Sequence, residues 1–301
     1  MKKHNKKQIP MAIAYDFDGT LSPGNMQEYG FMRKLGYKDP TEFWSKCQEL
    51  AKKQQADSVL AYMKTMLDES ARKGVSFSKR DFCEYGRSVR LFKGVSTWFS
   101  RINAYAAERG ICLKHYIISS GLKEMIEGTS IAKEFDKIFA SSFMYDEKGV
   151  AFWAGVAINY TTKTQFLFRI NKGCLDINDN KGINHYLPQK KRAVPFSQMV
   201  YIGDGTTDIP CMRVVKSSGG YAIAVYQACS TRARATSSPC GPHRRTPTNS
   251  PRPTAASSPP ATAPGPSPCP IATCPSCRSA IASRSRRIGT STSFRGIPGS
   301  W

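Results

Sequence analysis

The chain has 301 residues, 40% of them hydrophobic and 11% aromatic, enough for one large or two small globular domains. Its formal net charge of +22 suggests a nucleic-acid or membrane partner, but the charge is uneven, since every acidic residue lies at or before Asp208. No apolar run approaches the roughly 18 residues that cross a bilayer. The cysteines before residue 227 are scattered, which is typical of reduced thiols, so we predict a cytoplasmic protein without a membrane partner.

The last 75 residues, 227–301, differ sharply in composition from the rest. They contain 13 of the 19 prolines and ten arginines, but no Lys, Asp or Glu. Such a segment cannot bury enough apolar surface to offset its chain entropy, and we predict a disordered, low-complexity tail. Arginine without lysine, beside Ala, Pro, Ser, Thr and Cys, is also what GC-rich codons give when read out of frame. A frameshift origin for 227–301 is therefore a second hypothesis.

Apolar runs and helical periodicities alternate along the chain before that tail. The basic start weakly resembles a signal peptide, but Asp16 interrupts its apolar stretch and no small-residue cleavage site follows. We therefore predict that this segment is a strand of a soluble protein. Strands are predicted at 11–15, 115–119, 137–143, 199–202 and 221–226, with a hairpin over 150–160. Amphipathic helices are predicted around 43–51, 59–67, 79–90, 95–105 and 164–170. This alternation predicts an α/β fold with a parallel sheet covered on both faces.

Two pairs of carboxylates follow predicted strands. The stretch AYDFDGTL places Asp16 and Asp18 after the first strand, and YIGDGTTD places Asp204 and Asp208 after a later one. Ligands of open parallel sheets bind at the carboxyl ends of the strands, so we expect these side chains to converge. Four converging carboxylates require a cation, and an all-oxygen ligand set suits Mg²⁺.

Uncharged and basic groups complete the predicted site. The segment IISSG places Ser119 and Ser120 after another strand, and Lys163 lies just before a predicted helix. Glycines beside these positions let backbone amides approach an anion closely. A carboxylate nucleophile, a metal, a hydroxyl and a lysine together indicate phosphoryl transfer.

These segments resemble the motifs of the haloacid dehalogenase-like (HAD) hydrolase superfamily. DFDGTL is similar to the first motif, IISSG to the second, Lys163 to the third and GDGTTD to the fourth, in that order over residues 11–226. The resemblance implies a Rossmann-like doubly wound core (11–22 and 91–226) with an inserted helical cap (23–90). The cap type indicates the phosphoserine-phosphatase-like branch.

The resemblance also implies a role for each site residue. Asp16 would be the nucleophile that forms an aspartyl-phosphate, and Asp18 the general acid/base. Ser119 would hydrogen-bond the transferred phosphoryl group, and Lys163 would neutralise Asp16 and the phosphate. The implied Mg²⁺ ligands are Asp16, Asp18 (through its backbone carbonyl), Asp204 and Asp208, the last from the first or second coordination shell. The implied substrate-phosphate residues are Gly19, Thr20, Ser119, Ser120, Gly121 and Lys163.

The second aspartate narrows the predicted reaction. Dehalogenases of the family lack it, because a halide leaving group needs no proton, whereas an alkoxide needs a general acid such as Asp18. We therefore predict a Mg²⁺-dependent phosphatase acting on a small-molecule phosphate monoester. The alternatives are a HAD-type phosphomutase or phosphotransferase, and a nucleic-acid-binding protein that uses the basic tail.

Several structural alternatives and departures stay open. Asp16 and Asp18 can form a turn and helix cap, Lys163 can be an ordinary helix-start lysine, and Asp208 can be a helix N-cap. Ser120 can take the part of Ser119. Asn25 stands where phosphoserine phosphatases usually have a substrate-binding Glu, and Thr207 stands where many relatives have Asn.

Overall fold

The computed structural model describes residues 8–226, which fall within one compact unit of the chain. The predictions for residues 227–301, namely disorder, a frameshift origin and nucleic-acid binding, lie outside the described residues. Within residues 8–226, no helix combines the length and the apolar character needed to cross a bilayer.

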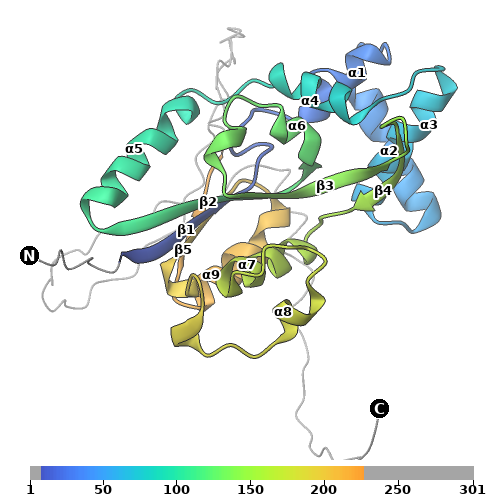
Figure 1. Cartoon of the computed structure of the whole chain (residues 1–301). Helices are drawn as coiled ribbons and strands as arrows, with labels where there is room; N and C mark the ends of the chain where they lie inside the picture. The colour runs from blue at the N-terminus through green and yellow to red at the C-terminus, as the bar shows by residue number, and fades with distance from the viewer. Residues whose placement is uncertain (1–7, 227–301) are drawn as a thin grey trace, which may run out of the picture. The chain divides into compact units, whose positions relative to one another are not determined.

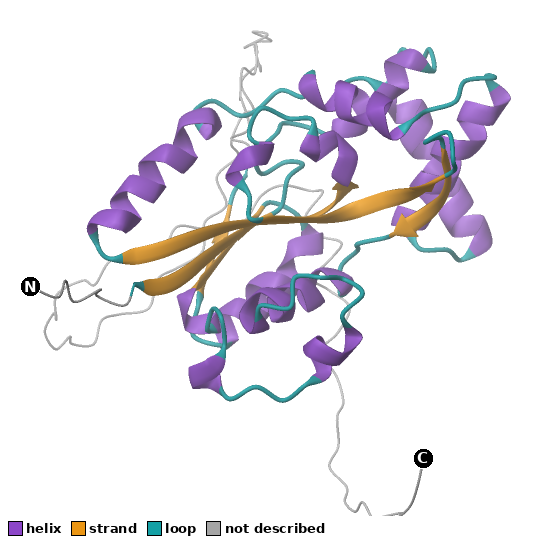
Figure 2. Cartoon of the chain, viewed as in Figure 1, coloured by secondary structure: helices purple, strands orange, loops and turns teal. Residues whose placement is uncertain are grey.

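A mixed sheet forms the centre of the described part (Figures 1 and 2). Its six strands within residues 8–226 lie in the order β4-β3-β2-β1-β5-β6. They are β1 (Ile9–Tyr15), β2 (Ile111–Leu122), β3 (Lys137–Tyr145), β4 (Ala151–Val156), β5 (Met199–Gly203) and β6 (Tyr221–Ala224). Neighbouring strands run parallel except β3 and β4, which are antiparallel. The predicted parallel sheet is confirmed. The hairpin predicted over 150–160 is wrong in its extent, since that segment holds only β4, which pairs antiparallel with β3 and forms one edge of the sheet.

Helices cover both faces of this sheet. In Figure 1, α5 and α6 lie on one face and α7, α8 and α9 on the other. The helices that follow β1 are α1 (Phe31–Lys34), α2 (Pro40–Gln54), α3 (Ser58–Arg72), α4 (Lys79–Arg87) and α5 (Val95–Glu108). The later helices are α6 (Lys123–Glu127), α7 (Thr162–Lys172), α8 (Asn180–Asn184) and α9 (Ile209–Ser217).

Strand β1 is buried on both faces, which fixes the position of its carboxyl end. Ile13 and Tyr15 belong to the hydrophobic cluster that includes Phe99 of α5, whereas Ala12 and Ala14 belong to a second cluster on the opposite face. Successive side chains of a strand point to opposite faces, so the apolar run at 11–15 fills both clusters at once. The residues directly after β1 are therefore held by packing on two sides.

The helical block between β1 and α5 packs on the sheet through aromatic rings. Phe31 and Phe43 lie 6.0 Å apart between ring centroids, and Phe82 of α4 stacks on Phe143 of β3 at 5.6 Å. These rings share one continuous cluster with core residues of β1 and β2. The division into a core (11–22 and 91–226) and a cap (23–90) stays a prediction, and "cap" below denotes residues 23–90.

Most predicted elements are present, with different ends. The strand predicted at 115–119 is longer, Ile111–Leu122, because residues 111–114 alternate between partly buried and exposed positions while pairing with β1. The helix predicted at 79–90 ends at Arg87, and a capping box with Ser78 begins it: Asp81 N donates to Ser78 Oγ at 3.2 Å. The helix predicted at 164–170 spans Thr162–Lys172.

Candidate active site

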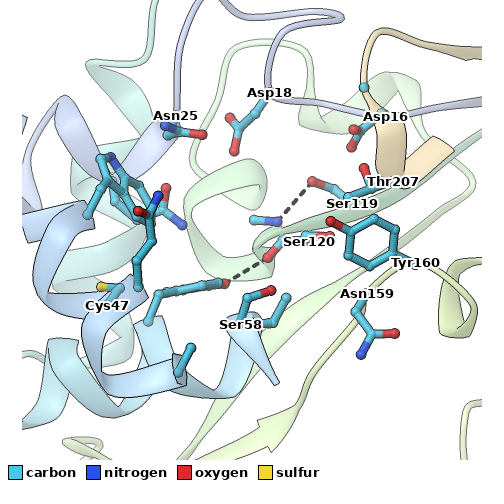
Figure 3. A pocket seen from close by; sticks show the side chains of 18 of the residues that line it. Asp16, Asp18, Asn25, Cys47, Ser58, Ser119, Ser120, Asn159, Tyr160 and Thr207 are labelled. Carbon is cyan, nitrogen blue, oxygen red and sulfur yellow. Dashed lines mark hydrogen bonds between the residues drawn. The ribbon is translucent and has the colours of Figure 1, made fainter. Parts of the chain in front are cut away.

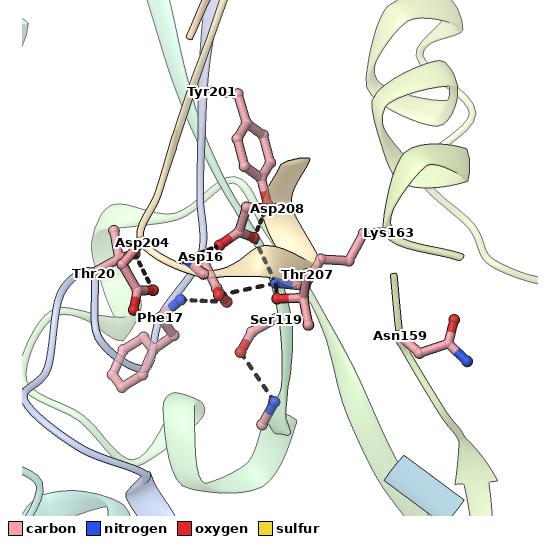
Figure 4. A network of polar contacts seen from close by, with 12 residues as sticks. Asp16, Phe17, Thr20, Ser119, Asn159, Lys163, Tyr201, Asp204, Thr207 and Asp208 are labelled. Carbon is pink, nitrogen blue, oxygen red and sulfur yellow. Dashed lines mark hydrogen bonds and ion pairs between the residues drawn. The ribbon is translucent and has the colours of Figure 1, made fainter. Parts of the chain in front are cut away.

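A buried lysine joins carboxylates from two distant segments (Figure 4). Lys163, in the first turn of α7, is 0% exposed, and its Nζ lies 2.9 Å from Asp16 Oδ2 and 2.7 Å from Asp208 Oδ1. Tyr201 donates its hydroxyl to the same Asp208 oxygen at 2.7 Å, and Gly205 N donates to Asp208 Oδ2 at 3.0 Å. Both oxygens of Asp208 are thus already engaged by the protein, which places this residue as a support for Lys163.

The surroundings of this ion triad shift the pKa values of its members. Burial raises the pKa of Asp16 to about 7, with Lys163 opposing the rise and Asp208 adding to it. Burial lowers the pKa of Lys163, but the charges of Asp16 and Asp208 outweigh it, and the net pKa is raised. Lys163 therefore stays protonated, and Asp16 depends on nearby positive charge to remain ionised at neutral pH.

Three of the predicted carboxylates can hold a metal ion together. One oxygen from each of Asp16, Asp204 and Asp208 lies within 4.8 Å of the others. Octahedral Mg²⁺ holds its oxygen ligands at about 2.1 Å, a size that such a cluster can surround. Asp204 is exposed and its Oδ1 accepts a hydrogen bond from Thr20 Oγ1 at 3.2 Å. The donor set fits a hard cation, with Asp16 and Asp204 as its best-placed side-chain ligands.

Asp18 stands apart from this three-carboxylate group. Its Oδ1 accepts from Met26 N at 3.1 Å, at the point where the chain enters the cap. Burial, with the charge of Asp16 next, raises the pKa of Asp18 well above its ordinary value. The two aspartates of DFDGTL thus have different surroundings, and Asp18 is the one suited to hold a proton.

Gly19 brings the backbone after Asp18 close to the fourth motif. Its φ is +77°, which favours glycine, and a Cβ built there would lie 2.1 Å from Asp204 Oδ2. Thr20, the next residue, hydrogen-bonds Asp204 as described above and is buried. In this structure Gly19 and Thr20 therefore contact a predicted metal ligand, and their predicted role in binding phosphate stays a prediction.

The carboxyl end of β2 supplies the hydroxyl groups. Ser119 is 1% exposed, and its Oγ accepts from Gly121 N at 3.0 Å. A Cβ at Gly121 would lie 2.3 Å from Met26 Cε and 3.1 Å from Asp18 Oδ2, so glycine is required for this approach. Tyr62 of α3 donates its hydroxyl to Ser120 O at 2.7 Å. The second motif is thus held between the core and the cap.

These groups open onto a cavity of about 480 Å³ (Figure 3). Six of the predicted site residues line it: Asp16, Asp18, Ser119, Ser120, Gly121 and Asp204. Lys163 and Asp208 lie beneath it, fully buried. The structure thus brings the residues of all four motifs together, and the predicted roles of the individual residues stay predictions.

The structure bears on two of the structural alternatives, those for Lys163 and Asp208. Lys163 is a buried partner of two carboxylates, unlike an ordinary helix-start lysine. Asp208 occupies the N-cap position of α9, yet its side chain makes no cap hydrogen bond to that helix. Thr207 faces Lys163, whose Nζ donates to Thr207 Oγ1 at 3.4 Å.

Several residues that sequence reasoning missed complete the site. Tyr201 supports Asp208, and its place in YIGDG, three residues before Asp204, was a usable signal. Gln27, Trp44 and Tyr62 line the cavity from the cap. Asn159 lines it from the core, and its Nδ2 donates to the carboxylate of Asp57, the N-cap residue of α3.

His115 does not line the cavity, and it is held by hydrogen bonds in the core. Tyr15 donates its hydroxyl to His115 Nδ1 at 3.0 Å, and His115 Nε2 donates to Asn103 Oδ1 at 2.8 Å. Trp98 Nε1 in turn donates to the Tyr15 oxygen at 2.9 Å. Burial lowers the pKa of His115 to about 4, so the ring is neutral and serves to hold Tyr15, the neighbour of Asp16.

A protein of Borreliella burgdorferi strain B31 is 29% identical over 238 residues, which are 71% of this chain and 81% of that protein. A HAD family hydrolase from Salmonella enterica serovar Typhi aligns with a TM-score of 0.49 at 17% identity, over 72% of this chain and 69% of that one. A probable phosphoserine phosphatase from Vibrio cholerae aligns with a TM-score of 0.46 at 14% identity, over 71% and 55%.

Likenesses to solved structures at these TM-scores say nothing about the substrate of this chain. The family model does carry an assignment: the model described as haloacid dehalogenase-like hydrolase matches residues 13–213. That range contains all four motifs and two thirds of the chain. The chain therefore belongs to the haloacid dehalogenase-like hydrolase family.

Proposed function

We propose that the chain is a Mg²⁺-dependent phosphatase that hydrolyses a small-molecule phosphate monoester through an aspartyl-phosphate on Asp16. The observation that carries the proposal is the contrast between the two aspartates. Asp16 is held by Lys163 at 2.9 Å beside a cation-sized carboxylate cluster, while Asp18 accepts a single backbone hydrogen bond and has a strongly raised pKa.

The first half-reaction transfers the phosphoryl group to the protein. One carboxylate oxygen of Asp16 attacks phosphorus, the bond between phosphorus and the ester oxygen breaks, and Asp18 donates its proton to the departing alkoxide. Lys163 offsets the negative charge on Asp16, and Ser119, which lines the cavity, would hydrogen-bond the phosphoryl oxygens.

The second half-reaction returns the protein to its starting state. Asp18, now ionised, accepts a proton from water as the water oxygen attacks the phosphorus of the aspartyl-phosphate. The bond from phosphorus to Asp16 breaks, and inorganic phosphate leaves. Bound Mg²⁺, held by Asp16, Asp204 and the backbone carbonyl of Asp18, would supply the positive charge that neutralises the carboxylates and the phosphate.

The test is phosphate release from p-nitrophenyl phosphate by the full chain. We expect activity that EDTA abolishes and Mg²⁺ restores, and a loss of at least a thousand-fold in Asp16→Asn because the nucleophile is removed. Asp68→Asn, in an exposed ion pair with Lys64, is the matched control and should keep wild-type activity. If Asp16→Asn keeps most of the activity, the proposal is wrong. Transfer to an added alcohol in place of water would indicate the phosphotransferase alternative.

A further inference from the structure

The cavity above Asp16 has two walls of different chemistry. Its charged lining residues are Asp16, Asp18 and Asp204, all in segments predicted to belong to the core. From the cap, the polar and aromatic lining residues are Asn25, Gln27, Trp44, Gln48, Ser58 and Tyr62. Among the residues that the structure describes, no Lys, Arg, His or Glu side chain lines this cavity. A substrate group that faces the cap thus meets neutral side chains.

Two buried polar atoms of this cavity lack a hydrogen-bond partner within residues 8–226. They are Gln27 Oε1, on a side chain only 2% exposed, and Ser120 Oγ. An unsatisfied buried acceptor costs about 1–3 kcal/mol, so such atoms are unusual in a folded protein. Both residues line the cavity, so they are the candidates for hydrogen bonds to the O–H groups of a ligand.

Gln27 is also tied to the predicted general acid. It directly follows Met26, whose backbone N–H donates to Asp18 Oδ1 at 3.1 Å. Asp18 must lie beside the ester oxygen of the substrate, because it protonates the leaving alcohol. The part of the substrate that faces Gln27 is therefore the alcohol.

The aromatic residues of the cap wall offer ring surface. Trp44 Nε1 donates to Glu28 Oε1 at 3.0 Å, and Tyr62 donates to Ser120 O at 2.7 Å, so both polar ends are already occupied. Their ring centroids lie 6.0 Å apart at an interplanar angle of 72°. Glu28 also accepts from Asn25 Nδ2 at 2.8 Å and does not line the cavity. The rings thus favour a substrate with an apolar C–H face.

We infer that the substrate's alcohol is an uncharged, hydroxyl-bearing group, as in a sugar or polyol phosphate, with its hydroxyls on Gln27 and Ser120. This inference rests on the proposed phosphatase function. A substrate carboxylate, such as that of phosphoserine, would face a cap wall that offers no cation side chain to bind it. A trimethylammonium group, as in phosphocholine, could lie against Trp44 or Tyr62, but it has no donor for Gln27 Oε1.

The experiment compares kcat/KM of the full chain with Mg²⁺ on five esters. They are glucose 6-phosphate, glycerol 3-phosphate, phosphoserine, phosphocholine and, as a reference without hydroxyls, p-nitrophenyl phosphate. We expect at least one of the two hydroxylated esters to exceed phosphoserine and phosphocholine by tenfold or more. In Gln27→Met, of similar size, the ratio of kcat/KM for the best hydroxylated ester to that for p-nitrophenyl phosphate should fall about tenfold, the equivalent of one lost hydrogen bond.

Two further variants keep the inference testable. Gln54→Leu lies in α2 but outside this cavity, and should leave the ratio unchanged. If Gln27→Met fails to fold, Gln27→Leu serves in its place, and its ratio should fall as well because leucine offers no acceptor for a substrate hydroxyl. A preference for phosphoserine or phosphocholine, or an unchanged ratio in the Gln27 variant, would overturn the inference and leave the phosphatase proposal standing. Absence of phosphate release from all five esters would overturn both.

Discussion

The cavity has a floor, formed by Asp16 with Lys163 and Asp208 behind it, and a wall formed by the cap. The two are built in opposite ways. On the floor, Lys163 and Asp208 have partners for their charges within 3 Å before any substrate binds. In the wall, Gln27 Oε1 is buried without a partner among residues 8–226. A charged site that is organised in advance lowers the reorganisation needed in the transition state, whereas unsatisfied neutral groups select a ligand. We therefore expect changes in the floor to affect the chemical step and changes in the wall to affect substrate choice.

The largest effect that would test this comparison is expected at Lys163. Lys163→Met leaves two buried carboxylates without their cation, so we expect the free energy of unfolding to drop by about 3–5 kcal/mol. Phosphatase activity should fall at least a thousand-fold. Urea unfolding followed by circular dichroism, together with phosphate release, checks both. Lys64→Met, which removes a lysine from an exposed pair with Asp68, should change neither by much. Near wild-type stability of Lys163→Met would show that the floor is not organised as described.

A second test concerns the close approach of Gly19 to Asp204. Gly19→Ala should weaken the apparent Mg²⁺ affinity about 10- to 100-fold, because the new Cβ displaces Asp204. Gly36 is a matched control: its φ is +78°, but a Cβ there meets nothing within 4 Å. Gly36→Ala should lower the free energy of unfolding by about 1 kcal/mol, because alanine is strained in the left-handed backbone conformation, and should leave Mg²⁺ affinity unchanged. Activity measured against Mg²⁺ concentration separates the two, and equal affinities would contradict the predicted role of Asp204.

A third test uses pH and the buried ring behind the floor. The pKa of His115 is lowered to about 4 in the folded chain, against about 6.5 unfolded, so below pH 6.5 the unfolded chain binds more protons. Stability from this group is complete above pH 6.5 and is lost as the pH falls toward 4, by up to about 3 kcal/mol. Urea unfolding at pH 7, 5.5 and 4.5 measures how steeply the free energy of unfolding changes with pH. His115→Phe should flatten it, and an unchanged slope in that variant would assign the effect elsewhere.

The smallest effect is expected in the cap, away from the cavity. Glu69 accepts from Arg72 Nη2 at 2.6 Å, from Lys46 Nζ at 3.1 Å and from the Tyr37 hydroxyl at 2.7 Å. These contacts, those from Arg72 first, lower the pKa of Glu69 to about 2. The contribution of Glu69 to the free energy of unfolding is present above pH 4.5 and is lost as the pH falls toward 2.

Because Lys46 and Arg72 are about half exposed, Glu69→Gln should cost only about 1 kcal/mol at pH 7. Its kcat on p-nitrophenyl phosphate should match the wild type, since Glu69 does not contact the cavity. Thermal unfolding at pH 7 and pH 3.5 checks the first point. A fall in kcat would show that the cap and the chemical step are coupled, contrary to the expectation that only changes in the floor affect the chemical step.

Much of the fold and the site could be predicted because both depend on local patterns. The runs at 11–15 and 199–202 are short and apolar, and each ends in a polar motif, which predicts a buried strand and its carboxyl end. The full extent of β2 could not be predicted, since residues 111–114 alternate between partly buried and exposed positions and only their pairing with β1 makes them strand residues. The predictions for residues 227–301 remain predictions.

The sequence by itself determined the chemistry of the floor: the spacing of Asp16 and Asp18, and the order in which Ser119, Lys163 and Asp204 follow. Residue identity and position near the ends of strands, or for Lys163 at the start of a helix, are features that a linear chain displays. Only the tertiary structure decided which side chains form the cap wall and which of their atoms are left without a partner among residues 8–226. The unpartnered oxygen of Gln27, and the ring surfaces of Trp44 and Tyr62, depend on how the cap packs against the core. No local pattern encodes that packing, because it joins residues far apart in the chain.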